Sequence, residues 1–237
     1  MAGARHVHAR RAAASRDEET IADTGVRMRW ARPHTFDRER ALRWLGPAER
    51  ARVNAMPHDG LRDRFLLGRM LLRELAAEAG GIRPEEVRIV ARCARCGAEH
   101  GRPRIAWPDP AGPAWSASLS SCPELVIAVV APAGIAVGVD VEPGRAAGPR
   151  SRETERRGAV VGLIGAPSGT AIRRWVRTEA VLKADGRGLR VEPGLVRFDG
   201  TAARLDDRPQ EFRLIDRRID GCLVSAAAAG PIRRRGQ

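Results

Sequence analysis

Four short apolar runs lie between residues 105 and 141, and turns that contain proline or glycine separate them. Runs of this length, divided in this way, are typical of β-strands in a meander. No stretch of the chain approaches the roughly 18 consecutive apolar residues of a membrane-spanning helix, so we expect no such helix. The expected strands are Ile105–Trp107, Trp115–Leu119, Leu125–Val130 and Ile135–Val141.

On both sides of these strands, apolar residues recur at the spacing of a helix. Helices are expected to begin at a capping Asp37, at Pro47 and at a capping Asp59, the last ending at Gly80-Gly81. Further helices are indicated near Glu155–Leu163 and over residues 170–185. Two last strands, Phe212–Ile219 and Cys222–Ala229, meet at Asp220-Gly221, which is a hairpin signal. The order predicts an α+β fold with a seam near residue 134.

The 237 residues carry a net charge of +13, and 41 of the 42 basic residues are arginine; Lys183 is the one lysine. About half of that charge lies in segments without apolar periodicity, which we interpret as basic tails. The predicted organisation is a disordered tail over 1–19, an N-terminal half over 20–134, a C-terminal half over 135–230 and a tail over 231–237. Four cysteines without a secretory signal favour a reducing, cytoplasmic compartment.

Two carboxylates follow each other at an interval of two at the end of an expected strand, in Gly138-Val139-Asp140-Val141-Glu142. Alternation along a strand places Asp140 and Glu142 on one face. Oxygen ligands in this arrangement suit a hard cation such as Mg²⁺. The pattern alone is equally that of a half-exposed strand.

The helix over 170–185 supplies a second set of polar residues. Trp175, Glu179 and Lys183 recur at intervals of four and therefore share one helix face. A tight, glycine-rich turn follows at Asp185-Gly186-Arg187-Gly188. By itself, the Glu179–Lys183 pair is also what a surface ion pair would look like.

The two motifs together resemble those of the broad-specificity, surfactin-synthetase-activating 4'-phosphopantetheinyl transferases. Three upstream segments, Arg64–Arg69, Gly101-Arg102-Pro103 and Trp115–Ser120, are similar to further family motifs in the same order. The resemblance covers roughly residues 45–200, and a Cys-rich loop before Gly101 resembles that of actinobacterial members. It implies two similar α+β halves related by a pseudo-twofold, with coenzyme A bound between them.

The resemblance also implies a reaction and the residues that perform it. The phosphopantetheine arm of coenzyme A moves to a serine of an acyl or peptidyl carrier protein, with release of adenosine 3',5'-bisphosphate, as in the holo-[acyl-carrier-protein] synthases. Asp140, Glu142 and Glu179 would hold Mg²⁺. Glu179 and Lys183 are the candidate catalytic residues, because Glu179 could deprotonate the carrier serine and Lys183 could assist or bind phosphate. We expect a cytoplasmic monomer with an acidic carrier protein as partner. A carrier of secondary-metabolite biosynthesis and one of fatty-acid synthesis are equally compatible with the sequence.

The coenzyme-binding candidates by resemblance are Arg52, Arg64, Arg102 and Ser118, since arginine forks bind phosphate well. One departure from the family concerns Leu119, which stands where members usually carry a phosphate-binding histidine. Leucine donates no hydrogen bond, so either coenzyme binding is weaker or a neighbouring serine or arginine compensates.

Other interpretations stay open from the sequence. A catalytically weak member could act as a carrier-binding scaffold, because acidic carriers suit a basic surface. A basic nucleic-acid-binding protein is less favoured, because aromatic residues are 4% of the chain and its tryptophans are scattered. Cys93, Cys96 and His100 have the spacing of metal ligands, but a structural zinc site normally needs four, so unpaired thiols are the alternative.

Overall fold

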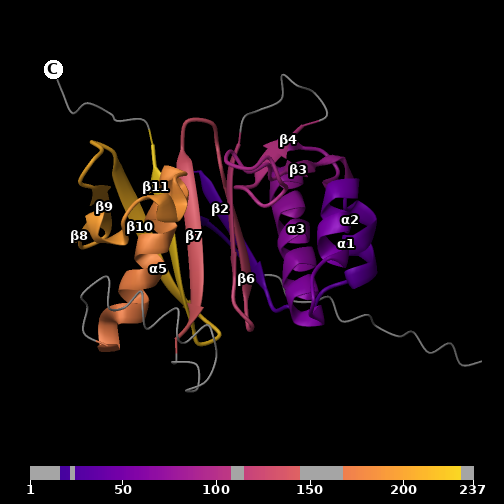
Figure 1. The fold of residues 1–237 in the computed structure, drawn as a ribbon, viewed down its shortest axis with the longest axis horizontal. Helices are drawn as coiled ribbons and strands as arrows, with labels where there is room; N and C mark the ends of the chain where they lie inside the picture. Colours follow the sequence, from indigo (N-terminus) through magenta and orange to yellow (C-terminus); the bar gives the residue numbers. More distant parts are fainter. Residues whose placement is uncertain (1–16, 22–24, 108–114, 145–167, 231–237) are drawn as a thin grey trace, which may run out of the picture.

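The computed structural model describes residues 17–21, 25–107, 115–144 and 168–230, which form a mixed α+β fold (Figure 1). The helices are α1 (Arg38–Trp44), α2 (Pro47–Asn54), α3 (Asp59–Gly80) and α5 (Ser168–Asp185). The strands are β1 (Asp17–Ile21), β2 (Val26–Ala31), β3 (Arg88–Val90), β4 (Arg104–Ala106), β5 (Ser116–Ser121), β6 (Val126–Ala131), β7 (Ala136–Pro143), β8 (Val196–Asp199), β9 (Ala202–Leu205), β10 (Glu211–Ile219) and β11 (Cys222–Ala229). Among these residues no helix is both long and apolar enough to cross a membrane.

The strands form two main antiparallel sheets. The first has the order β1-β2-β6-β5 and the second the order β7-β11-β10-β9-β8, while β3 and β4 pair separately. The chain passes from the first sheet to the second between Ala131 and Ala136. The expected meander therefore divides, because β7 pairs with β11 instead of with β6.

Helices cover the outer face of each sheet, and the inner faces of the two sheets pack together. Figure 1 shows α1, α2 and α3 on one side, α5 on the other, and the sheets between them. Along β6, Val126 and Val130 face α3, whereas Ile127 and Val129 join the core between the sheets. This alternation explains why β6 is apolar throughout: both of its faces are buried.

Several predicted elements are confirmed by the structure. Asp37 caps α1, its side chain accepting a hydrogen bond from the backbone N–H of Arg40. The hairpin between β10 and β11 turns at Asp220-Gly221, both with positive φ, as a tight two-residue turn requires. The helix expected over 170–185 is α5. The longest helix, α3, begins at Asp59 and is capped by His58, so Asp59 is its first residue, not its cap.

Other predictions were wrong, or concern residues that the structure does not describe. Residues 17–19, expected in a disordered tail, belong to β1, where Glu18 forms ion pairs with Arg27 and Arg29 of β2. These pairs and the β1–β2 ladder fix a segment whose composition resembles a tail. Strands β2, β8 and β9 were not expected. Residues 1–16, the predicted helix near 155–163 and the tail over 231–237 lie outside the described residues.

Candidate functional site

The carboxylate motif lies on β7, in the layer between the inter-sheet core and α5. Val139 and Val141 point into that core, as the alternation predicts. Asp140 points the other way, toward α5, and is 6% exposed, while Glu142 is half-buried at the end of the strand. The strand thus presents Asp140 to the helix that carries Glu179 and Lys183.

Gly138 sets the distance between that strand and that helix. A Cβ atom at this position would lie within 2.9 Å of Lys183 Cβ, and closer still to the backbone of Ala180 and Ala184. Only a residue without a side chain permits this approach. Gly138 therefore lets β7 lie close enough to α5 for Asp140 to reach Lys183.

The lone lysine ties three elements together. Lys183 Nζ donates to Asp140 Oδ1 at 2.6 Å, to the backbone oxygen of Val139 at 3.1 Å and to Ser120 Oγ at 3.2 Å. Its side chain is 29% exposed, so the ion pair with Asp140 is partly shielded from water. All three donors of the ammonium are used. These contacts argue against the alternative that Lys183 only forms a surface ion pair with Glu179.

Asp140 Oδ2 and the carboxyl group of Glu179 are the candidate ligands for a cation. Asp140 Oδ2 is buried and has no hydrogen-bond partner among the described residues. Burial raises the pKa of Glu179, the nearby Asp140 carboxylate raises it further, and Lys183 partly offsets this. A buried oxygen acceptor without a donor, in electrostatic contact with Glu179, fits a divalent cation with oxygen ligands. Among the described residues, the ligand atoms of Asp140, Glu142 and Glu179 do not all lie within 4.8 Å of one another.

Two serines on one face of β5 join the first sheet to β7. Ser118 Oγ accepts a hydrogen bond from Val139 N at 3.1 Å, and Ser120 Oγ accepts one from Val141 N at 3.3 Å. Ser120 Oγ also donates to Asp140 Oδ1 at 2.8 Å. Ser118, our coenzyme-binding candidate, is 4% exposed in this position. Ser120 was not among the predicted site residues, although its spacing of two from Ser118 was the available signal.

Leu119, between these serines, points to the opposite side. It packs against α3, where a Cβ on Gly68 would lie 2.7 Å from its Cδ2. The leucine therefore fills apolar space that Gly68 leaves open.

Arg102, just before β4, contacts β7 and the C-terminal end of α5. Its guanidinium donates to the backbone oxygens of Val137 at 3.0 Å and Ala184 at 3.5 Å. Desolvation lowers the pKa of Arg102, and the nearby Arg104 lowers it further. A cation at this end of a helix offsets the partial negative charge of the final carbonyl groups.

The remaining basic candidates lie on α2 and α3. Arg52 donates to the backbone oxygen of Glu99 at 2.8 Å and stacks over Phe65, 5.0 Å from the ring centroid. Arg69, which the sequence did not single out, lies over the same ring at 4.9 Å, and burial lowers its pKa to about 10. Arg64 is half-buried and makes no hydrogen bond or ion pair with any residue that the structure describes.

A groove of about 590 Å³ opens beside the start of β7. The residues that line it include Arg102, Arg104, Trp115, Gly134–Ala136 and Gln210. Ala136 precedes Asp140 by four residues on β7, about 13 Å at the usual rise of a strand. One elongated ligand could therefore occupy the groove and reach the carboxylates.

The chain is similar to a known protein over most of its length. A phosphopantetheinyl transferase of Thraustochytrium sp. (strain ATCC 26185 / S-3) is 31% identical over 229 residues, which cover 83% of this chain and 74% of that protein. No family model matches the chain. At this identity and coverage the chain belongs to the phosphopantetheinyl transferase family.

Proposed function

We propose that the chain transfers the 4'-phosphopantetheine arm of coenzyme A to a serine of an apo acyl or peptidyl carrier protein. Adenosine 3',5'-bisphosphate is the second product. The observation that carries this proposal is the convergence of Asp140 on β7 with Glu179 and Lys183 on α5. Each half also places a long helix against an antiparallel sheet, which supports the arrangement of two similar halves that the family resemblance implies.

Asp140, Glu142 and Glu179 would hold Mg²⁺ in this proposal. The unpartnered Oδ2 of Asp140 and the carboxyl chemistry of all three residues support that assignment. A bound Mg²⁺ neutralises the charge of a diphosphate and of the leaving group during phosphoryl transfer. Lys183 and Ser120 both bind Asp140 through Oδ1, and Oδ2 has no hydrogen-bond partner among the described residues.

Glu179 is the residue that takes the proton of the carrier serine, directly or through a water molecule. A carboxylate whose pKa is raised by burial is a better base than an exposed one, because its pKa lies nearer the working pH. Lys183 is a positioning residue in this scheme, since its three donors bind Asp140, Val139 and Ser120.

Coenzyme A would lie in the groove beside the start of β7. The volume of the groove is in the range of small-molecule sites, and Arg102 and Arg104 supply positive charge for phosphate groups. Arg52, Arg64 and Ser118 remain proposed coenzyme contacts by family resemblance. The net charge of +13 favours an acidic carrier protein as the second substrate.

The test is a panel of apo carrier proteins incubated with coenzyme A, Mg²⁺ and the full chain. Transfer adds roughly 340 Da to a carrier, the mass of the phosphopantetheine arm, which mass spectrometry detects. Glu179→Gln should abolish the gain, whereas Glu211→Gln, on an exposed position of β10, should retain it. Carrier binding without any mass gain would favour the scaffold, and full activity of Glu179→Gln would refute our site.

A further inference from the structure

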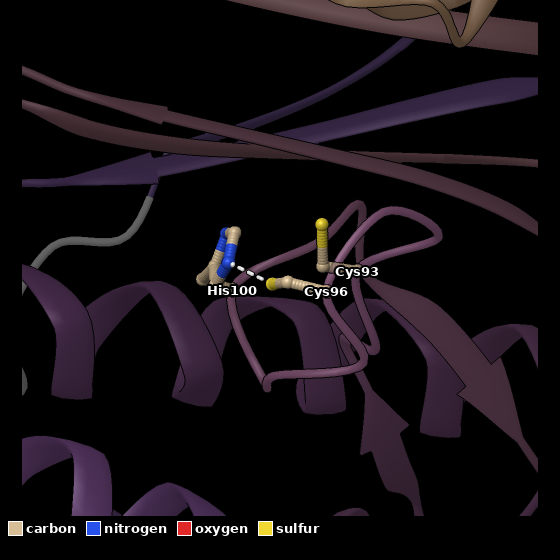
Figure 2. Close-up of side chains that lie close together, drawn as sticks. All are labelled: Cys93, Cys96 and His100. Atoms are coloured by element: carbon tan, nitrogen blue, oxygen red, sulfur yellow. Dashed lines mark hydrogen bonds between the residues drawn. The ribbon is translucent and has the colours of Figure 1, made fainter.

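The loop between β3 and β4 brings three metal-ligating side chains together, away from the carboxylate site. The ligand atoms of Cys93, Cys96 and His100 all lie within 4.8 Å of one another. Figure 2 shows Cys96 and His100 directed toward each other, with Cys93 beside them. Cys96 Sγ and His100 Nε2 are 3.0 Å apart.

The backbone of the loop forms a tight turn around the first cysteine. Gly97 N donates to the carbonyl oxygen of Cys93 at 2.9 Å, and Cys93 N donates to Ala98 O at 2.7 Å. Gly97 has a φ of +75°, a conformation that residues with a side chain rarely adopt. The turn thus holds the Cys93 thiol close to Cys96 and His100.

The spacing of the three ligand atoms suits a tetrahedral zinc ion. With Zn–S of about 2.3 Å and Zn–N of about 2.0 Å, two sulfurs lie about 3.8 Å apart and sulfur and nitrogen about 3.5 Å apart. The pair of Cys96 and His100 would need to separate by only about 0.5 Å from the observed 3.0 Å. Two thiolates and an imidazole select zinc over the hard cations that oxygen ligands prefer.

The loop is anchored to the rest of the protein at both of its ends. Glu99 Oε2 accepts from Ala91 N at 3.2 Å, and Arg52 of α2 donates to Glu99 O at 2.8 Å. Gly101 N donates to Ala91 O, and a Cβ on Gly101 would meet the backbone of Arg92. The residue after this glycine is Arg102, which contacts β7 and α5.

We propose that Cys93, Cys96 and His100 bind one Zn²⁺ ion, with a solvent molecule in the fourth position. Three protein ligands leave one position open, unlike the four of a closed structural zinc site. The ion therefore adds to the hydrogen bonds that hold the loop between β3 and β4, and through this loop it supports Arg102 and Arg52. Two thiolates balance the charge of the ion, so the site is neutral among the neighbouring Arg92 and Arg95.

A second cluster, Cys122, Glu124 and Cys222, provides the matched control. Its two sulfurs are 3.6 Å apart and buried where the two sheets pack together. Burial raises the pKa of both thiols, which disfavours the thiolate form that binds metal. We therefore expect no zinc at this cluster.

The experiment measures metal in the full-length protein purified with reductant, loaded with Zn²⁺ and freed of excess metal. One zinc per chain is expected by elemental analysis, and Co²⁺ in its place should give thiolate charge-transfer and tetrahedral d–d bands. Cys96→Ser and His100→Ala should each lower zinc content to a small fraction, while Cys122→Ser and Cys222→Ser should retain it. Because metal content is measured without coenzyme or carrier, the outcome is independent of transferase activity.

Three results would overturn the proposal. The first is wild-type protein that holds no zinc after loading. The second is full zinc content in a Cys93→Ser/Cys96→Ser variant, which would place the ion elsewhere. The third is a cobalt spectrum without thiolate charge transfer, which would exclude the cysteines as ligands.

Discussion

Gly138→Ala introduces one methyl group at the contact between β7 and α5. The added Cβ would lie less than 2.5 Å from Ala180 O and from Ala184 N, and 2.9 Å from Lys183 Cβ. The first two of these atoms belong to the helix backbone, so no rotation of a side chain relieves the clash. The helix must therefore move away from the strand.

The size of that movement follows from the distances. An ordinary contact of a Cβ atom begins at 3.4 Å, so α5 must retreat by about 1 Å. Overpacking of this kind costs about 2–3 kcal/mol, the upper part of the usual range, because backbone atoms are involved. In a protein of this size that loss lowers Tm by about 4–12 °C. A displacement of 1 Å between Asp140 and Glu179 is expected to lower kcat about 100-fold.

The assays are thermal unfolding followed by circular dichroism and the carrier-protein mass gain. Gly60→Ala is the matched control: the same methyl group near the start of α3 meets nothing within 4 Å. It should leave kcat unchanged and leave Tm equal or slightly higher, because alanine favours helix. If Gly138→Ala unfolds at the wild-type temperature and transfers at the wild-type rate, our account of the glycine is wrong.

Three further substitutions test the same site. Lys183→Arg should lower kcat about tenfold or more, because a planar fork cannot reach three acceptors that converge on one nitrogen; full activity would mean that an arginine serves equally well. Leu119→His should lower KM for coenzyme A but also destabilise the protein by about 1–3 kcal/mol, because apolar packing against α3 is lost; an unchanged or raised KM would show that another group already serves the coenzyme. Glu179→Gln should raise Tm in EDTA at pH 7, because the folded state raises the pKa of Glu179 and its ionised form is therefore destabilising. Below the raised pKa of the folded state the carboxyl is protonated, so the gain should fade as pH falls toward the unfolded value of about 4.5 and be absent below it; a gain that persists at pH 3 would contradict the electrostatic cause.

Local sequence patterns were sufficient for much of the fold. The spacing over 170–185 predicted α5, and Asp220-Gly221 predicted the last hairpin. Strand β2 was missed although Val26, Met28 and Trp30 alternate with arginines. Its two arginines lie against Glu18 and Glu78, which come from another strand and from α3, so nothing local indicated that they would be paired.

For the candidate site, too, local sequence patterns predicted one part and missed another. Alternation along residues 138–142 and the interval of four along α5 correctly assigned the faces on which Asp140 and Lys183 lie. The family resemblance implied that these faces meet, but periodicity alone could not show it. The contact depends on the absent side chain of Gly138 and on the path of a helix some 40 residues later. Nor could it show that Ser120 and Lys183 share the same carboxylate oxygen.

The sequence alone therefore determined the α+β class, the faces of strand and helix, and the family that the motifs resemble, because these depend on local periodicity and spacing. Only the tertiary structure decided how the expected meander divides into two sheets, because strand pairing joins residues far apart in the chain. It also decided the surroundings of Arg102, Lys183 and Leu119. No local sequence pattern predicts that an arginine will lie at a helix end, that a lysine will have three acceptors, or that a leucine will pack over a glycine. Their roles follow from which backbone atoms and cavities the packing brings within reach.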